Sequence, residues 1–254
     1  TEKRSREGMT FDEAYEKMYE RNYFGMMMVE VGDADALITG VYTKYADSIQ
    51  AAKEVIGIRD GLKHIGAMHI MNTKKGTYFL ADTLFNRHPS TETLIDVAKL
   101  TYNTVKFFNH EPVMAMLSYS NFGSDKQGSP ASVHEVVSKL HNTYPEMVVD
   151  GEMQVTFALN TELRDKKFPF SKLAGKNVNT LIFPNLSSAN TAYKMMLEMG
   201  LAETIGPIQM GLNKPVHILD VESTVRDIVN MTAIAVLDAM VQEQIDWNNK
   251  LQDS

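Results

Sequence analysis

Small polar residues crowd one loop that follows an apolar segment, and they offer the hydroxyl and backbone N–H groups that bind anionic ligands. The segment from Val113 to Tyr119 predicts a buried strand. The loop residues are Ser118, Ser120, Asn121, Gly123, Ser124 and Gly128. At the carboxyl end of a strand in an α/β fold, such a loop is a common ligand site. An ordinary polar connection is the alternative, since small residues of this kind also form turns.

A second polar group lies at the start of a helix that is expected after Pro184. Asn190 and Lys194 are four residues apart, so they share one face of that helix, and Tyr193 lies beside them. These side chains could hold a phosphate or a pantetheine arm. A solvated helix face with a packed tyrosine would have the same spacing, and the spacing alone does not decide between the two.

Charged residues cluster before the last expected helix, at Asp220, Glu222, Arg226 and Asp227. Asp227 falls in the first helical turn, where the helix dipole stabilises a negative charge. A structural role is therefore enough to explain Asp227, and a solvated surface is enough to explain the cluster.

Several kinds of chemistry are excluded or unsupported. The chain has no cysteine, which excludes disulfides, thiolate metal sites and cysteine nucleophiles. Its seven histidines form no HExxH motif, so we assign no metal site. Neither a GxGxxG nor a phosphate-binding P-loop motif is present. The net charge of -7 does not favour nucleic acid as a partner.

Membrane insertion and secretion are not expected. The first residues, TEKRSREGMTFDEAYEKM, lack the apolar core of a signal peptide. No later segment reaches the roughly 18 apolar residues that a spanning helix requires. We expect a cytoplasmic protein.

The elements that must position these groups follow from hydrophobic periodicity and capping residues. Strands are expected over Met26–Val31, Asp35–Gly40, His64–Met71, Gly76–Ala81, Val113–Tyr119, Thr180–Phe183 and Val216–Leu219. The turn residues Asn72 to Lys75 predict that the two strands on either side of them form a hairpin-like pair. Helices are expected after the caps Thr10 and Ser90, over 48–55, 132–141 and 224–247, and between Pro184 and Gly200. Strands that alternate with helices predict α/β layers. No strand precedes the first helix, so we expect the chain to begin inside a domain.

Several segments together resemble phosphate acetyltransferases along essentially the whole chain. They are NYFGMMMV, DADALITG, FLADTLFN, MLSYSNFGS, VDGEMQ, FPNLSSANTAYK, IGPIQMGLNKPVHIL and DIVNMTAIAVLDA. Two further segments, SYSNFGS and KPVHILDVESTVRDIVNMTA, are similar to the transacetylase-like C-terminal region of bacterial hybrid malic enzymes. Free-standing transacetylases typically have Ser-Thr-Lys-Gly-Ser and Leu-Ser-Arg-Gly at the corresponding places.

The resemblance implies a three-layer α/β/α fold of the isocitrate and isopropylmalate dehydrogenase type, with two subdomains, a ligand cleft and a dimer as the basic unit. Subdomain one would comprise residues 1–60 with 214–254, and subdomain two residues 61–213. The first strands of the fold would be missing from this chain.

The resemblance also assigns roles to residues. Asp227 matches the aspartate thought to take the proton of the CoA thiol. The family's serine and arginine are replaced by Asp220 and Val221, the next glycine by Glu222, and a phosphate-binding arginine by Gln50. Phe122 replaces the lysine of the serine-rich loop. The acetyl-CoA-binding residues would be Arg4, Ser118, Ser120, Asn121, Gly123, Ser124, Asn190, Tyr193, Lys194 and Asp227.

Two functions remain open on these grounds. One is a binding domain that senses acetyl-CoA, supports oligomerisation and regulates a malic enzyme, with no active catalytic residues of its own. In that case NADP and a divalent metal would bind only in a separate malic enzyme domain. The alternative is an active phosphate acetyltransferase, which converts acetyl-CoA and phosphate to acetyl phosphate and CoA.

Overall fold

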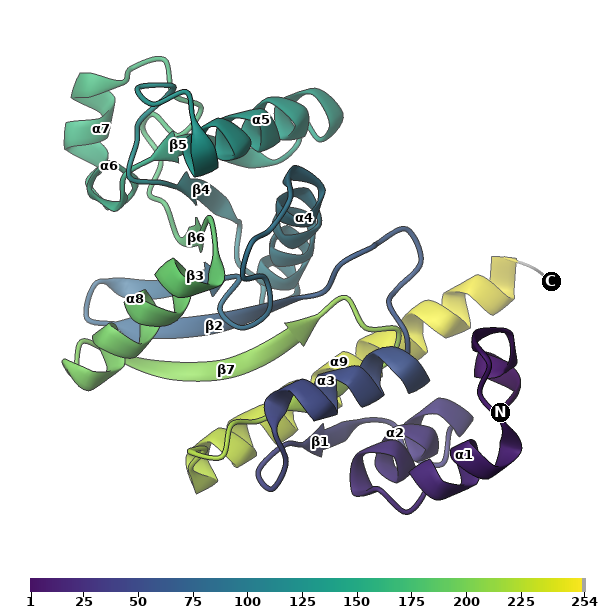
Figure 1. The fold of residues 1–254 in the computed structure, drawn as a ribbon. Coiled ribbons are helices and arrows are strands. Elements are labelled where there is room, and N and C mark those ends of the chain that lie inside the picture. Colours follow the sequence, from purple (N-terminus) through teal and green to yellow (C-terminus); the bar gives the residue numbers. More distant parts are fainter. Residues whose placement is uncertain (253–254) are drawn as a thin grey trace. The chain divides into compact units, whose positions relative to one another are not determined.

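The computed structural model describes residues 1–252, and the chain divides into two compact units. Unit 1 comprises Thr1–Leu62 together with the chain from Gly206 onwards, and unit 2 comprises Lys63–Ile205. Figure 1 shows the order of the elements along the chain. Each unit is described by itself below.

The sheet of unit 2 has six strands in the order β5-β4-β6-β3-β2-β7. The strands are β2 (Gly66–Thr73), β3 (Gly76–Ala81), β4 (Val113–Leu117), β5 (Val148–Met153), β6 (Thr180–Ile182) and β7 (Ala202–Met210), the last of which crosses the boundary between the units. β2 and β3 form the expected antiparallel hairpin. The β3–β6, β6–β4 and β4–β5 pairs are parallel, so β3, β6, β4 and β5 all end at the same edge of the sheet.

Helices cover both faces of this sheet, which confirms the expected three-layer arrangement (Figure 1). One side has α4 (Thr91–Phe107) and α5 (Gly128–Thr143), and the other has α6 (Val155–Leu159), α7 (Thr161–Lys167) and α8 (Leu186–Glu198). Ser90 caps α4 as predicted, because its hydroxyl accepts a hydrogen bond from the Thr93 N–H at 3.1 Å.

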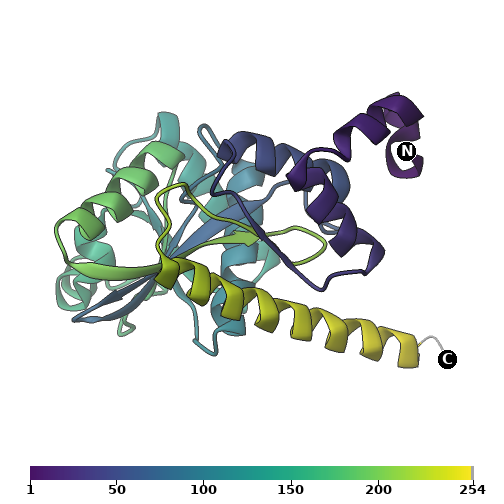
Figure 2. The ribbon, with the colours of Figure 1, turned by 90° about the horizontal axis from the view of Figure 1, so that it is seen from below.

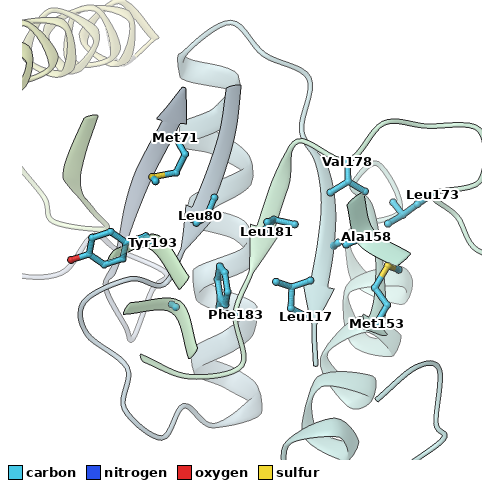
Figure 3. Close-up of a cluster of buried hydrophobic side chains, with 12 residues drawn as sticks. Met71, Leu80, Leu117, Met153, Ala158, Leu173, Val178, Leu181, Phe183 and Tyr193 are labelled. Atoms are coloured by element: carbon cyan, nitrogen blue, oxygen red, sulfur yellow. The ribbon is translucent and has the colours of Figure 1, made fainter. Parts of the chain in front are cut away.

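Apolar side chains from several strands and from α6 and α8 form one buried cluster in unit 2 (Figure 3). Its members include Met71, Leu80, Leu117, Met153, Leu173, Leu181, Phe183 and Tyr193. Burying one such side chain stabilises a fold by about 1.5–3 kcal/mol. This cluster fixes the sheet against α6 and α8, and therefore fixes the loops that follow β4 and β6.

Unit 1 contains two parallel strands, β1 (Leu37–Thr39) and β8 (Val216–Ile218). A 3-10 helix (Glu2–Glu7) precedes the helices α1 (Phe11–Lys17), α2 (Arg21–Val31), α3 (Tyr45–Val55) and α9 (Val225–Gln252). Thr10 caps α1 as predicted, in a reciprocal capping box with Glu13. Figure 2 shows α9 as a single long helix. None of the helices in the described part of the chain has the length and apolar character needed to cross a membrane.

The prediction of a strand over Met26–Val31 is wrong, because this segment is the second half of α2. Met26 and Val29 are buried whereas Met28 and Val31 are exposed, which is a helical and not an alternating pattern. Unbranched methionine also favours helix over strand. The helix ends at Gly32, whose φ of 87° is a left-handed conformation that glycine adopts without strain.

Two strands were not anticipated. β5 contains Asp150 and Glu152, and β7 contains Gly206 and Pro207, so neither segment has the apolar pattern of a buried strand. Both polar residues of β5 are buried: Asp150 accepts hydrogen bonds from Ser171 and the Lys172 N–H, and Glu152 accepts hydrogen bonds from the serine-rich loop.

Candidate functional site

The serine-rich loop follows β4 and runs beside the end of β5. The Ser118 N–H donates to the carbonyl of Met153 at 2.9 Å, and the Phe122 N–H donates to the carbonyl of Glu152 at 2.8 Å. The backbone of the loop is therefore held by the neighbouring strand. The loop lies at the carboxyl edge of the sheet, where ligands bind in open α/β folds.

Ser120 is committed to the internal structure of this loop. Its side chain is buried, and its hydroxyl lies 2.8 Å from that of Ser124 and donates to Glu152 at 3.2 Å. It also accepts the Asp125 N–H at 2.9 Å. We therefore assign Ser120 to loop structure, although the resemblance placed it among the ligand contacts.

Other polar groups of the loop are partly exposed. The Asn121 side-chain oxygen accepts the Gln154 N–H at 2.9 Å, and the Ser118 hydroxyl accepts the Ser120 N–H at 3.2 Å. Ser124 is exposed, while its hydroxyl accepts the Asn121 N–H at 3.1 Å. Ser118, Asn121 and Ser124 are the loop side chains that a ligand at this edge could reach.

The tip of the loop is anchored by an apolar contact. Phe122 adopts a φ of 47°, followed by Gly123 at 82°, so the chain makes a tight left-handed turn here. The Phe122 ring lies 4.8 Å from that of Phe168 and 5.0 Å from that of Phe170, measured between centroids. Where the resembling transacetylases have a lysine, this chain therefore has a cluster of aromatic rings, in which Phe122 and Phe168 are half-buried and Phe170 is exposed.

The start of α8 lies at the same edge of the sheet, because α8 follows β6 and β6 pairs in parallel with β4. Tyr193 is 6% exposed, belongs to the core in Figure 3, and stacks on His69 with ring centroids 4.3 Å apart. Its ring is used for packing, which is the alternative that the spacing left open. Asn190 is half-buried and Lys194 is exposed.

A third loop, after β3, completes this edge. The carboxylate of Asp82 is buried and accepts the N–H groups of Ala67 at 2.9 Å and Asn86 at 2.9 Å. Burial raises the pKa of Asp82, and these N–H groups act in the opposite direction. The carbonyl of Asn86 accepts the Leu186 N–H at 2.9 Å, which connects this loop to the start of α8.

The remaining predicted residues belong to unit 1. Asp227 is the third residue of α9, and its carboxylate accepts the N–H and the hydroxyl of Thr224 at 2.8 and 2.7 Å. The Thr224 hydroxyl accepts the Asp227 N–H in return, at 3.3 Å. This reciprocal cap gives Asp227 a structural role. Asp220 and Val221 are exposed in the turn before the cap, and Asp220 accepts the Val221 N–H at 2.6 Å.

Gln50 and Arg4 make specific contacts on α3. Gln50 donates to Glu54 at 2.7 Å, and Glu54 also accepts Lys17 at 2.7 Å and the Tyr23 hydroxyl at 2.6 Å. Burial acts to raise the pKa of Glu54, but these hydrogen bonds and the Lys17 charge outweigh it and lower the pKa to about 2. Arg4 donates to the carbonyls of Lys53 and Glu54, both at 2.9 Å, and pairs with Glu7. Arg4 therefore caps the C-terminal end of α3.

Sequence reasoning missed Glu152, which organises the serine-rich loop from β5. The signal is the acidic residue within VDGEMQ, a segment that also resembles phosphate acetyltransferases. Within residues 1–252, no three His, Asp or Glu side chains are grouped so as to hold a metal ion.

The comparisons with known proteins agree with this fold. The family of phosphate acetyl/butaryl transferases matches residues 1–236. The chain is 37% identical to the NADP-dependent malic enzyme of Salmonella typhimurium, and the match covers 92% of this chain but only 31% of that protein. It is 34% identical to the phosphate acetyltransferase of Bacillus subtilis, over 91% of this chain and 71% of that protein.

The solved structures include a phosphotransacetylase from Streptococcus pyogenes, with a TM-score of 0.87 and 34% identity. That match covers 92% of this chain and 72% of the other. The family match, the curated relatives and the solved fold coincide over nearly all of the sequence. The chain therefore belongs to the phosphate acetyl/butaryl transferase family.

Proposed function

We propose that this chain is the transacetylase-like domain of an NADP-dependent malic enzyme, which binds acetyl-CoA and regulates oxidative decarboxylation of malate to pyruvate in the cytoplasm. The identity to the malic enzyme of Salmonella typhimurium supports this assignment. In such a protein NADP and the divalent metal act in a separate malic enzyme domain. The ligand of this domain is acetyl-CoA or CoA, held by Ser118, Asn121, Ser124, Asn190 and Lys194.

The observation that carries the proposal is the acidic turn before α9. Asp220 and Glu222 are both exposed in this turn, where the resemblance predicts a serine and a glycine on either side of an arginine. A unit charge 4 Å from another contributes about 4 kcal/mol at an effective dielectric near 20. Val221 stands where the resemblance predicts an arginine, so this attraction for phosphate is lost. The carboxylate of Asp220 adds a repulsion of similar size. Acetyl phosphate should therefore bind poorly.

The domain is also proposed to support a homo-oligomer built from dimers. α9 buries Met231 and Ala235 within unit 1, while Val229, Val236 and Met240 on other faces of the helix are more than half exposed. Contiguous apolar residues on a long helix are typical of a surface that a second protein surface covers.

The purified chain is expected to show no phosphate acetyltransferase activity above background. The physical reason is the loss of cationic groups and the gain of a carboxylate at the phosphate subsite. The measurement is acetyl phosphate formation from acetyl-CoA and phosphate, with the Bacillus subtilis phosphate acetyltransferase as positive control. A turnover rate within about tenfold of that control would show that the chain is an active transferase, which is the alternative. A tenfold ratio corresponds to a difference of roughly 1.4 kcal/mol in activation free energy.

Acetyl-CoA is expected to raise the melting temperature of the chain, because a ligand that binds only the folded state stabilises it by about 2.7 kcal/mol at one hundred times its dissociation constant. Lys194→Ala and Ser124→Ala should reduce this shift, since both side chains are exposed and both belong to the proposed ligand contacts. Lys167→Ala, at an exposed position on α7, is the matched control and should keep it. An equal shift in all four proteins would place the ligand elsewhere.

A further inference from the structure

A β-bulge directs Glu152 toward the serine-rich loop. Met116 of β4 pairs with Gly151, and the next residue, Leu117, pairs with Met153, so Glu152 is the extra residue of β5. Bulges redirect a side chain out of the normal alternation of a strand. The two strands approach so closely here that a Cβ on Gly151 would lie 2.5 Å from the carbonyl oxygen of Met116. Only glycine fits this position.

One carboxylate oxygen of Glu152 binds the loop directly. Oε1 accepts the N–H of Gly123 at 2.6 Å and the hydroxyl of Ser120 at 3.2 Å. Gly123 lies in the left-handed turn of the loop. The Ser120 hydroxyl also accepts a hydrogen bond from the Asp125 N–H. Oε1 of Glu152 thus holds Ser120 and Gly123 together, and these two residues position the exposed Ser124 that follows them.

The other oxygen, Oε2, has no hydrogen bond among the described residues, although the Glu152 side chain is 0% exposed. The imidazole of His134 on α5 faces this oxygen, with its Nδ1 3.3 Å from Oε2. That distance suits an ion pair, while the geometry is not that of a hydrogen bond. The His134 side chain is 60% exposed, so solvent reaches the imidazole but not the carboxylate.

A buried carboxylate is costly unless other groups compensate its charge. Here the compensation comes from two neutral donors on Oε1 and from the imidazole facing Oε2. The loop therefore depends on Glu152 for its shape, and the His134 imidazole is the group that faces the second oxygen of this side chain among the described residues.

We propose that Glu152 is a positioning residue that holds the serine-rich loop in its ligand-binding shape, and that the His134 imidazole keeps its second oxygen in place. The effect on acetyl-CoA affinity rests on the proposed function, whereas the effect on the loop itself does not. The pair acts through Ser120 and Gly123 and touches no ligand.

The direct test is amide hydrogen exchange of Gly123 and Asp125 in the chain without ligand, compared with the amides of β4. Glu152→Ala should raise exchange at the two loop amides at least about tenfold, since a buried hydrogen bond to a charged group is lost. Glu152→Gln keeps an acceptor for Gly123, and its amide can donate to a neutral His134, so protection should remain within about threefold of wild type. Exchange in β4 should not change with Glu152→Gln.

His134→Ala should also raise exchange at the loop amides, because Oε2 of the buried carboxylate loses the imidazole that faces it among the described residues. Combining it with Glu152→Gln should restore protection, because a neutral amide needs no counter-charge. Ser138→Ala, an exposed position one turn further along α5, is the matched control. If His134→Ala leaves the loop amides unchanged, or if the double variant is no better than His134→Ala, the proposed pairing is wrong.

The same variants then separate this inference from the proposed function. If the loop amides respond as described and acetyl-CoA binds the wild type, the affinity measured by calorimetry should fall in His134→Ala and recover in the double variant. If the amides respond but wild type binds no acetyl-CoA, Glu152 positions the loop and the proposed ligand is wrong. If acetyl-CoA binds wild type and His134→Ala equally, the loop shape does not control affinity and the functional part of the inference fails.

Discussion

Replacing Arg164 with methionine is expected to destabilise unit 2 by about 3 kcal/mol or more, because it leaves several buried acceptors without a donor. Arg164 is 0% exposed in the middle of α7. Its Nη2 donates to the carbonyls of Leu173 at 2.7 Å and Lys176 at 2.6 Å. Nη1 donates to the carbonyl of Ala158 at 3.3 Å. Methionine fills the apolar part of the space and replaces none of these hydrogen bonds.

The change should also reach the serine-rich loop. Arg164 holds the chain segment that contains Phe168 and Phe170, and both rings pack on Phe122 at the loop tip. We therefore expect Arg164→Met to lower the melting temperature and to weaken acetyl-CoA binding together.

Urea denaturation measures the free energy of unfolding for this comparison. Arg164→Lys tests geometry, because an ammonium keeps the charge but cannot present the guanidinium's planar set of donors to three separate carbonyls. Lys167→Ala, exposed on the same helix, controls for the loss of a cation from α7. Arg164→Met with wild-type stability would show that the carbonyls find other partners, and the predicted role of the guanidinium would be wrong.

A loss of stability on acidification is expected from His217, which is 1% exposed on β8. Gln209 determines how the imidazole is protonated. Its Oε1 accepts the Ile218 N–H at 2.9 Å and its Nε2 donates to the Ile218 carbonyl at 3.0 Å, so the amide orientation is defined. Oε1 also lies 3.3 Å from Nδ1 of His217, which places the hydrogen of the neutral ring on Nδ1.

The other ring nitrogen, Nε2, has no hydrogen bond among the described residues, and Asp238 Oδ2 is 3.8 Å away. Burial lowers the pKa of His217 from its usual 6.5 to about 4. Burial also raises the pKa of Asp238, against the nearby charge of Arg59. The histidine is therefore neutral in the folded protein at neutral pH.

The sign of the pH dependence follows from these values. Between pH 6.5 and 4 the unfolded chain binds a proton on this histidine and the folded chain does not, so falling pH favours unfolding. The contribution approaches about 3 kcal/mol at the acid end of that range. Asp238 has the opposite effect on stability, because its pKa is raised in the folded state. As the pH falls through its titration, the folded chain binds the proton more readily than the unfolded chain.

The measurement is the free energy of unfolding of wild type and His217→Gln from pH 7.5 to 4.5. At neutral pH the variant should be less stable than wild type, because its packing differs. As the pH falls, the free energy of unfolding should decrease more in wild type than in the variant. His88→Gln, at an exposed position, controls for removing one histidine. Parallel curves for wild type and His217→Gln would contradict the prediction.

Features that depend on neighbours along the chain can be predicted from the amino-acid sequence alone. The Thr10 and Ser90 caps, the hairpin turn between residues 72 and 76, and the polar loop after β4 were all predictable. Each depends on residues within a few positions, and the rules for caps, turns and alternation apply at that range. The motifs that resemble phosphate acetyltransferases are also local, and they were sufficient to identify the family.

Which polar residues face solvent and which stabilise the fold depends on the three-dimensional structure. Ser120 and Ser124 are both serines of one loop, yet Ser120 is buried against Glu152 and Ser124 is exposed. Tyr193 stacks on His69, a partner more than a hundred positions away that no local pattern could indicate. The segment Met26–Val31 could be read as strand or helix until its burial was known. Burial and the pairing of buried charges arise from contacts between residues distant in sequence, and those contacts exist only in the folded chain.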